Sequence, residues 1–411
     1  MSAERANDCY VALELSQRTW LIGYLLPGAD TVQTTAVAGG NAEALLSALG
    51  RIESLARARS HAGCALGSMR VCFEAGYDGF WLARFLIDRD IDTTILDPSS
   101  FLVSRRGRRV KTDRVDVEAM VFTLKAYLLG DRSVCRPVRL PSVAEEDAKR
   151  LSRERTQLKK ERTRHVNRIR ALLVLHGIRS VPGLWGGRWK EALSNIRTGD
   201  GRELGRFIFR ELYRQFERLD LVHSQLKSFE KERIQACETE GAINGNAKIR
   251  VLKQLDGIGE VGATQLVVEV FHRTFKNRKH LASYLGLSPS PYSSGEVHRD
   301  QGISKAGNKQ ARVMLFELAW CWLKYQLQSQ LTRWYRSLFS GHGSRSGKIG
   351  IVALARKLAI ALWRFIEDGE VPEGATLAVA AKLKFDCRRA VEPEARLLCV
   401  EMDIRRRVVV W

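Results

Sequence analysis

The alternation of hydrophobic and polar positions predicts strands at the start of the chain. Cys9–Leu15 alternates, Thr19–Leu26 is almost continuously apolar, and the polar residues between them read as a turn. Thr31–Val37 has the pattern of a third strand. Asn41 is then placed to cap a helix that ends near Arg59.

Shorter apolar runs continue the same domain. Arg70–Glu74 and Thr93–Leu96 have the length of strands, and helical patterns occupy Gly79–Asp88 and Asp113–Leu129. Strands that alternate with helices in this way predict an α/β domain, a mixed sheet flanked by helices, over residues 1–140.

The chain changes character between Ala144 and His176. Residues 149–170 hold ten basic residues and two acidic ones. Positions 144, 151, 158, 165 and 172 form a heptad row of Ala, Leu, Leu, His and Leu. We interpret 141–245 as a basic, coiled-coil-like helical region that dimerises and lies along phosphates through residues such as Lys159, Lys160 and Arg164. A solvated helix packed on one side is the alternative.

The remaining segments are predicted to be helical. Residues 246–370 include a Gly/Ser/Pro-rich stretch, a Trp-rich helix at Ala311–Gln328, a flexible loop at Ser340–Gly347 and a helix at Ile349–Ile366. Three basic residues interrupt the last helix, which therefore fails as a membrane span. Residues 371–411 form an extension to which the sequence assigns no role.

Composition narrows the choice of partner. The 411 residues include 67 Lys and Arg against 46 Asp and Glu, so the formal net charge is 67 − 46 = +21, which favours polyanions such as nucleic acids. Met1–Asp8 lacks the apolar core of a secretory signal, and the eight cysteines include no C-x-x-C pair. We therefore expect a cytoplasmic protein with reduced thiols.

Four carboxylates stand out in the N-terminal domain. Glu14 lies inside an apolar strand, Glu74 ends another strand, and Asp113 and Asp116 are three residues apart on a helix. If they converge at one sheet edge, a cation such as Mg²⁺ must neutralise them, and a two-metal carboxylate site suits phosphodiester chemistry. Each acid alone could equally be a surface residue or a helix cap. A basic run that could grip phosphate precedes the aspartates: Arg105, Arg106, Arg108, Arg109 and Lys111.

A glycine-containing turn marks the C-terminal domain. Leu255–Gly262 joins two apolar helical stretches, and Gly257 and Gly259 flank an isoleucine. This spacing resembles a helix-hairpin-helix motif, whose backbone N–H groups face DNA phosphate. An ordinary interhelical turn is the alternative.

Two sets of motifs resemble one family. Lys111–Glu118 is similar to the K-T-D-x-x-D signature of the DEDD insertion-sequence transposases, the IS-one-ten family that includes the Piv-type DNA invertases. Downstream, Leu285–Pro289, the Ser-Gly pair at 294–295 and Gly302–Arg312 resemble that family's G-L-x-P, S-G and I-S-K-x-G-N-x-x-x-R elements, in the same order.

The resemblance implies an N-terminal RuvC-like fold of the RNase H type. It assigns Glu14, Glu74, Asp113 and Asp116 as the catalytic, Mg²⁺-binding acids, although the family has aspartate where this chain has Glu14. It implies that Ser294, with Ser293 as a near rival, attacks DNA and forms a phosphoserine linkage. Nucleic-acid contacts are expected at Lys305, Asn308 and Arg312.

The family also implies a structured guide RNA, the bridge RNA, and a dimeric or tetrameric assembly in a prokaryotic cytoplasm. The leading hypothesis is thus a DNA transposase that acts as a serine recombinase on an insertion sequence, a mobile genetic element. One alternative is a two-metal, structure-selective nuclease without a covalent intermediate. Another is a catalytically decayed nucleic-acid-binding homologue, in which Glu14 marks the loss.

Overall fold

The structure, a computed structural model, describes residues 7–59, 67–76, 78–100, 112–239, 243, 245–294, 297–341 and 343–378, with only the backbone at 99, 292–294 and 297–301. The basic run 105–111 and most of the extension 371–411 therefore lie outside the described residues. The chain divides into two compact units, Met1–Ser142 and Val143–Trp411, and each is considered by itself.

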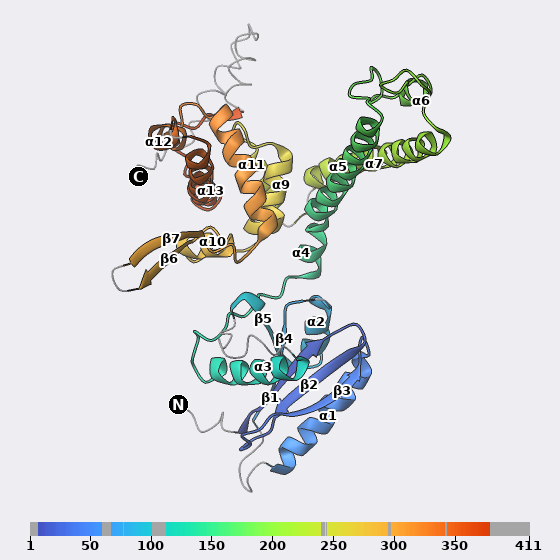
Figure 1. Cartoon of the computed structure of the whole chain (residues 1–411). Helices are drawn as coiled ribbons and strands as arrows, with labels where there is room; N and C mark the ends of the chain where they lie inside the picture. Colours follow the sequence, from blue (N-terminus) through green and yellow to red (C-terminus); the bar gives the residue numbers. More distant parts are fainter. Residues whose placement is uncertain are drawn as a thin grey trace. The chain divides into compact units, whose positions relative to one another are not determined.

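A five-stranded mixed sheet forms the centre of the first unit, in the order β3-β2-β1-β4-β5 (Figure 1). β1 pairs antiparallel with β2 and β2 with β3, whereas β1 with β4 and β4 with β5 are parallel. The predicted mixed sheet is confirmed, and its strands are β1 (Cys9–Leu15), β2 (Thr19–Leu25), β3 (Gln33–Ala38), β4 (Met69–Glu74) and β5 (Asp92–Leu96).

Helices cover both faces of this sheet. Alternate residues of a strand point to opposite faces, so Val11 and Leu13 of β1 belong to a core with α1 (Ala42–Arg59) and α2 (Trp81–Ile87). Tyr10 and Ala12 belong to a second core, which α3 (Asp113–Leu128) covers. Asn41 caps α1 as predicted, since its side-chain oxygen accepts a hydrogen bond from the backbone N–H of Ala44 at 2.9 Å.

The second unit is largely helical, with one short β-hairpin. Two long helices, α5 and α7, lie antiparallel and share a core with the short α6, while α8 to α13 surround a separate hydrophobic core (Figure 1). The elements are α4 (Val143–Ala148), α5 (Arg150–Leu175), α6 (Trp189–Ser194), α7 (Arg206–Glu238), α8 (Asn246–Leu252), α9 (Glu260–Leu266), the π-helix η4 (Val267–Phe271), α10 (Arg278–Tyr284), β6 (Pro289–Ser294), β7 (Val297–Ile303), α11 (Lys309–Tyr325), α12 (Gln330–Phe339) and α13 (Gly343–Glu367).

The prediction of a flexible loop at 340–347 is wrong, because α13 already begins at Gly343. A Cβ atom on Gly350 would lie 2.5 Å from Cγ of Phe339 on α12, so only a glycine lets the two helices approach so closely. Among the described residues, no helix has the length and apolar character needed to cross a membrane.

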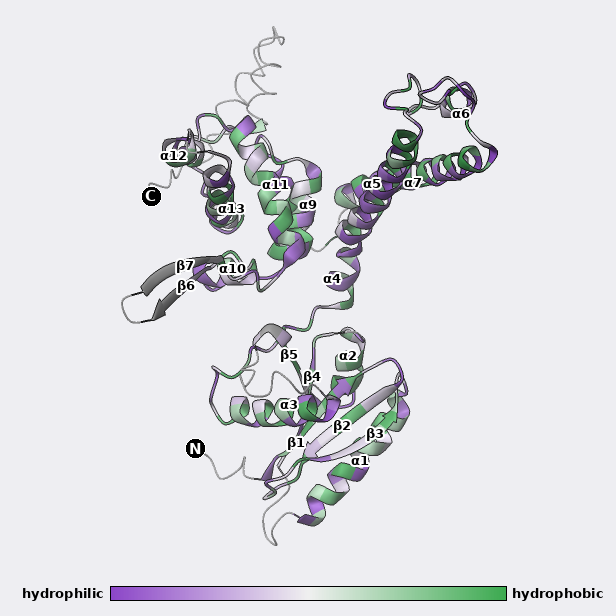
Figure 2. Cartoon of the chain, viewed as in Figure 1, coloured by the Kyte–Doolittle hydropathy of each residue, from purple (hydrophilic) through white to green (hydrophobic). Residues whose placement is uncertain are grey.

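The predicted heptad row on the basic helix finds its partner within the chain. Leu158 and Leu172 of α5 are buried, and His165 Nδ1 lies 2.8 Å from Oε1 of Gln215 on α7. An ion pair between Arg168 of α5 and Glu211 of α7, at 2.6 Å, joins the same two helices. Much of the remaining surface of α5 is hydrophilic (Figure 2). The predicted partner helix is therefore α7, and dimerisation stays a prediction.

Candidate active site

The carboxyl ends of the parallel strands β1, β4 and β5 meet at one edge of the sheet. The β1–β4 pairing runs to Leu13 opposite Phe73, so the next position along both strands brings Glu14 beside Glu74. Glu74 in turn pairs with Leu96 of β5. By strand alternation both glutamates belong to the face that carries Ala12 and Cys72, the face that α3 covers.

The start of α3 brings the two aspartates to the same face. Thr112 caps the helix, accepting a hydrogen bond from the backbone N–H of Val115 at 3.4 Å, and two acids in the first turn suit the helix dipole. Asp113 precedes the buried Val117 by four residues, and Asp116 precedes the buried Met120 by four, so both extend the stripe of α3 that packs on the sheet.

A close contact fixes where this helix crosses the sheet. A Cβ atom on Gly23 would lie 1.9 Å from Cγ1 of Val117, so this position of β2 must be glycine. Gly23 pairs with Ala12, two residues before Glu14 on β1. The first turn of α3 is thus anchored next to the strand that carries Glu14.

The four acids have the chemistry of a site for a hard divalent cation, since carboxylate oxygens are the ligands that Mg²⁺ prefers. Glu74 and Asp113 are exposed, and Glu14 and Asp116 are half-buried. Among the described side chains, no three acidic, histidine or cysteine residues lie close enough to hold one ion.

The predicted nucleophile lies at the far end of the β6–β7 hairpin. Ser294 is the last residue of β6 and pairs with Val297, and Ser293 pairs with His298. The sequence analysis noted only a Gly/Ser/Pro-rich stretch here, and the structure gives it a two-stranded ladder. The structure describes only the backbone here, so the choice between the two serines stays open.

The root of this hairpin is held by a dense set of backbone contacts. Ser304 N–H donates to the carbonyl of Ser288 at 2.9 Å, and Asn308 N–H donates to the carbonyl of Tyr284 at 2.9 Å. Gly307 has φ +112°, and a Cβ atom there would lie 2.2 Å from that carbonyl oxygen of Tyr284. Two chain segments therefore approach so closely that only glycine fits.

Asn308 and Arg312, both predicted to contact nucleic acid, also hold this root together. Asn308 caps α11, accepting a hydrogen bond from Ala311 N–H at 3.1 Å. Arg312 is 9% exposed and donates from Nη1 to the carbonyl of Leu285 at 3.1 Å. Burial lowers the pKa of Arg312. Lys305, by contrast, is exposed, in a left-handed conformation with φ 57°.

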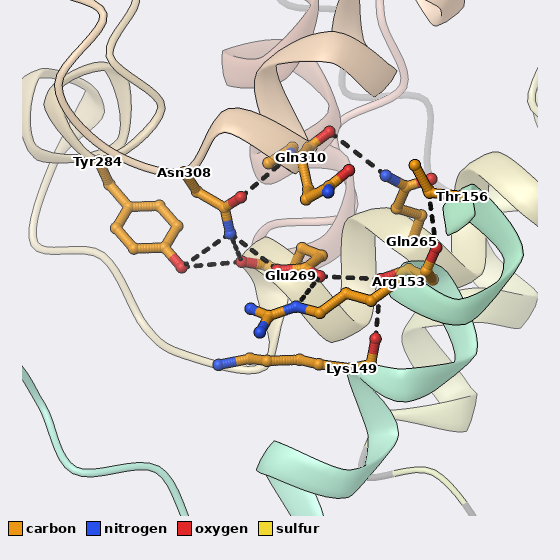
Figure 3. A network of polar contacts seen from close by, with 10 residues as sticks. Lys149, Arg153, Thr156, Gln265, Glu269, Tyr284, Asn308 and Gln310 are labelled. Carbon is orange, nitrogen blue, oxygen red and sulfur yellow. Dashed lines mark hydrogen bonds and ion pairs between the residues drawn. The ribbon is translucent and has the colours of Figure 1, made fainter. Parts of the chain in front are cut away.

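A buried acid that the sequence analysis missed lies beside the same root (Figure 3). Glu269 is 0% exposed and lies in the π-helix η4, a rare turn type that is frequent at functional sites. Its carboxylate accepts from Ser152 Oγ at 2.8 Å, Arg153 Nε at 3.3 Å and Asn308 Nδ2 at 2.9 Å. The sequence could have indicated this residue, because Glu269 stands alone between the apolar Val268 and Val270. A carboxylate buried in such a run requires hydrogen-bond or ion-pair partners.

The predicted glycine hairpin joins α8 to α9 as expected. Gly257 has φ +84°, and a Cβ atom there would lie 3.1 Å from Cβ of Tyr325, so the turn packs tightly on α11. Gly259 is the N-cap residue of α9. Glu260, in the first turn of α9, pairs with the buried Arg233 at 3.2 Å and with Lys253 at 2.9 Å. DNA binding by this turn stays a prediction.

On the basic helix, Lys160 and Arg164 are exposed and Lys159 is half-buried. Contact of these three residues with nucleic acid stays a prediction. Arg155 of the same helix pairs instead with Glu230 of α7 at 2.5 Å.

Comparison with known proteins places the chain in a family. A family model described as Transposase IS116/IS110/IS902 family matches residues 249–335, from α8 into α12. The protein y4rJ of Sinorhizobium fredii, named as a transposase, is 40% identical over 378 residues, which span 90% of this chain and 94% of y4rJ.

Relatives with lower identity or shorter matches also include transposases. The transposase for insertion sequence element IS1111A of Coxiella burnetii is 25% identical over 317 residues, 75% of this chain and 79% of that protein. The pilin gene-inverting protein of Moraxella bovis is 36% identical over 73 residues, 17% of this chain and 23% of its own length. The chain therefore belongs to the IS116/IS110/IS902 family of transposases, enzymes that act on DNA.

Proposed function

We propose that this transposase cuts and rejoins DNA through a Mg²⁺-dependent carboxylate site and a covalent phosphoserine intermediate. The observation that carries the first half is the shared face of Glu14, Glu74, Asp113 and Asp116 on a sheet whose strand order and flanking helices suit a RuvC-like fold. These four residues would hold the metal. When bound, Mg²⁺ supplies charge stabilisation at the reacting phosphate.

A divalent cation would neutralise the charge that the four acids bring to one face of the sheet. Like-charged carboxylates repel one another unless a cation neutralises them. Two of them lie on strand positions fixed by the sheet, and the other two on the first turn of α3. We therefore expect side-chain rotations, rather than backbone movement, to bring the oxygens together on one ion.

The serine performs the strand transfer in this proposal. As the bond from Ser294 Oγ to phosphorus forms, the phosphorus–oxygen bond to one strand end breaks. The departing oxygen takes up the serine's proton and leaves as a hydroxyl. Attack by the hydroxyl of a different strand then breaks the Oγ–phosphorus bond and returns the proton to Ser294. The phosphodiester bond energy is kept in the serine ester, so rejoining needs no nucleotide hydrolysis.

Basic surfaces would hold the nucleic acids. The basic run at 105–111 lies directly before the aspartates in the sequence. Further exposed cations are Lys160 and Arg164 on α5 and Lys305 after β7. We infer that these cations bind the element ends, the target DNA and a bridge RNA, in agreement with the net charge of +21. A homo-oligomer would bring two DNA ends together.

A denaturing gel tests the mechanism. The purified protein with its co-purified RNA is incubated with labelled element-end DNA, in Mg²⁺ or in EDTA. We expect a Mg²⁺-dependent DNA band that protease treatment shifts. It should be absent from Ser294→Ala and present in Ser293→Ala, a matched control one residue away.

Two outcomes would overturn parts of this proposal. Normal cleavage by Ser294→Ala, without an adduct, indicates a nuclease in which water attacks. Binding without any cleavage, restored by Glu14→Asp, indicates a decayed site, because the longer glutamate then fails the strict octahedral geometry of Mg²⁺. Unchanged or lower activity of Glu14→Asp would identify Glu14 as a working ligand.

A further inference from the structure

The carboxylate of Glu269 is buried where a charge is costly unless partners compensate it. Its side chain is 0% exposed, and removing one partner from a buried ion pair typically leaves an uncompensated charge. The partners of Glu269 come from distant parts of the second unit, more than a hundred residues earlier in the chain as well as later. The acid thus connects elements rather than stabilising one helix.

The first connection runs to the start of the basic helix α5. Ser152 Oγ and Arg153 Nε both donate to Oε1 of Glu269, at 2.8 and 3.3 Å. The guanidinium of Arg153 is held by its Nε, while 46% of the side chain remains exposed. Arg153 and Lys149, one helical turn apart, extend in the same direction (Figure 3).

The second connection runs to the root of the serine hairpin. Asn308 Nδ2 donates to Oε2 of Glu269 at 2.9 Å and to the Glu269 backbone carbonyl at 3.1 Å. The hydroxyl of Tyr284 donates to the same carbonyl at 2.8 Å. Burial raises the pKa of Tyr284, so its hydroxyl keeps the proton that this bond requires.

Tyr284 and Asn308 flank the hairpin on its two sides, since Tyr284 ends α10 before β6 and Asn308 follows β7. The backbone N–H of Asn308 donates a hydrogen bond to the backbone carbonyl of Tyr284 at 2.9 Å. A movement of Glu269 would therefore act on both strands of the hairpin together. A planar guanidinium, held on one edge and exposed on another, is also well suited to bind a phosphate group.

We propose that Arg153 binds a nucleic-acid phosphate, and that Glu269 couples this contact to the position of the β6–β7 hairpin. Arg153 then serves two partners, Glu269 inside the protein and the phosphate outside. Glu269 is a positioning residue, because it acts through Asn308 and Tyr284. The functional meaning of this coupling rests on the proposed role of Ser294, whereas the coupling itself does not.

Binding of a labelled DNA duplex, measured over a range of salt concentrations, tests the phosphate contact. Arg153→Gln keeps an N–H donor for Glu269 but removes the charge. We expect it to weaken binding and to reduce the slope of log K against log salt by about one unit. Arg153→Lys, which keeps the charge, should restore most of the slope. An unchanged slope in Arg153→Gln would overturn the phosphate contact.

Hydrogen exchange of the amides in 289–303, with and without the duplex, tests the coupling. In the wild type we expect the duplex to slow exchange in the hairpin. Arg153→Gln and Glu269→Gln should lose this response even at saturating duplex. Arg168→Gln, which removes a similarly exposed arginine of α5 that pairs with Glu211 of α7 instead of Glu269, should keep it.

A full response in Glu269→Gln would sink the coupling. Circular dichroism and thermal unfolding of each variant identify any that do not fold. If Glu269→Gln is one of them, the exchange response of Arg153→Gln, which alters a half-exposed side chain, tests the coupling. The readout is independent of catalysis. If the exchange response is present but no serine adduct forms, the coupling stands and the proposed function fails.

Discussion

The two units position their functional groups by different means. In the first unit, Asp8 is the only buried polar residue among those that the structure describes, and the candidate acids lie at the exposed edge of an apolar frame. In the second unit the described buried polar residues include Glu269, Arg312, Gln326 and Arg233. Their hydrogen bonds surround the root of the serine hairpin and the glycine turn.

The reason lies in the backbone. A sheet fixes the neighbours of every residue through its ladder of hydrogen bonds, so Glu14 and Glu74 need no side-chain support to lie side by side. Helices satisfy their own backbone groups and leave their mutual positions to side chains. A short hairpin between helices therefore depends on side chains such as Asn308, which bonds to the buried Glu269, for its orientation. Substitutions at the candidate acids of the first unit should therefore change activity but not stability. Substitutions at the buried polar residues of the second unit should change both together.

The strongest test of this contrast is Asp116→Asn. We expect loss of strand cleavage by roughly a hundredfold or more, because the proposed function makes Asp116 a ligand of the metal. The free energy of unfolding should change by less than about 1 kcal/mol, the size of a charge effect at a helix start. Cleavage assays and urea denaturation measure the two effects. A large loss of stability would show that the acids support the fold.

Gly307→Ala should act in the opposite way, through the fold. The new Cβ atom would meet the Tyr284 carbonyl at 2.2 Å in a left-handed backbone, so we expect a loss of roughly 3 kcal/mol in unfolding free energy. Gly302→Ala is the control, since Gly302 also has a positive φ but no atom near its Cβ position. Equal losses in both would mean that backbone strain, and not the close approach, decides the effect.

Gln326→Leu tests how much a buried polar side chain contributes to the stability of the second unit. Gln326 is 0% exposed and donates to the carbonyls of Asp256 and Thr376 at 2.8 and 2.9 Å, while its Oε1 accepts from Thr376 N–H at 2.7 Å. Leucine would leave these groups without that partner, at a cost of about 2 kcal/mol. Denaturation measures the loss. A neutral result would show that apolar packing alone holds the glycine turn.

The smallest effect concerns acid stability. Burial by itself would raise the pKa of Glu230, but hydrogen bonds from Arg155 and Arg233 outweigh it and hold the pKa below its ordinary value of 4.5. This stabilisation is complete above pH 4.5 and is lost as the pH falls through the lowered pKa. We expect Glu230→Gln to be less stable than the wild type at neutral pH and to lose less stability on acidification. Parallel pH profiles of the two proteins would contradict this.

Most of the first unit could be predicted from the sequence. Strand alternation, the polar turn and the Asn41 cap gave β1, β2, β3 and α1 with small errors in their bounds. The candidate acids were found because a carboxylate inside an apolar strand, such as Glu14, is unusual. Its neighbour Glu74 could be named from the sequence, but their adjacency depends on the pairing of β1 with β4.

The second unit was harder to predict. The hairpin β6–β7 was not predicted, because its segment is rich in Pro, Ser and Gly and two short polar strands carry no apolar alternation. The helix start at Gly343 was missed because residues 340–347 are rich in Gly and Ser, which are typical of loops.

The sequence by itself determined the mixed sheet, the basic helix, the family motifs and the four candidate acids, because each depends on local periodicity or on residue types at fixed spacing. Only the tertiary structure decided that the heptad row of α5 faces α7, that Asn308 caps α11 beside Glu269, and that Glu269 meets Arg153. These contacts join residues far apart in the chain. Their geometry follows from how the helices pack, which no local pattern records.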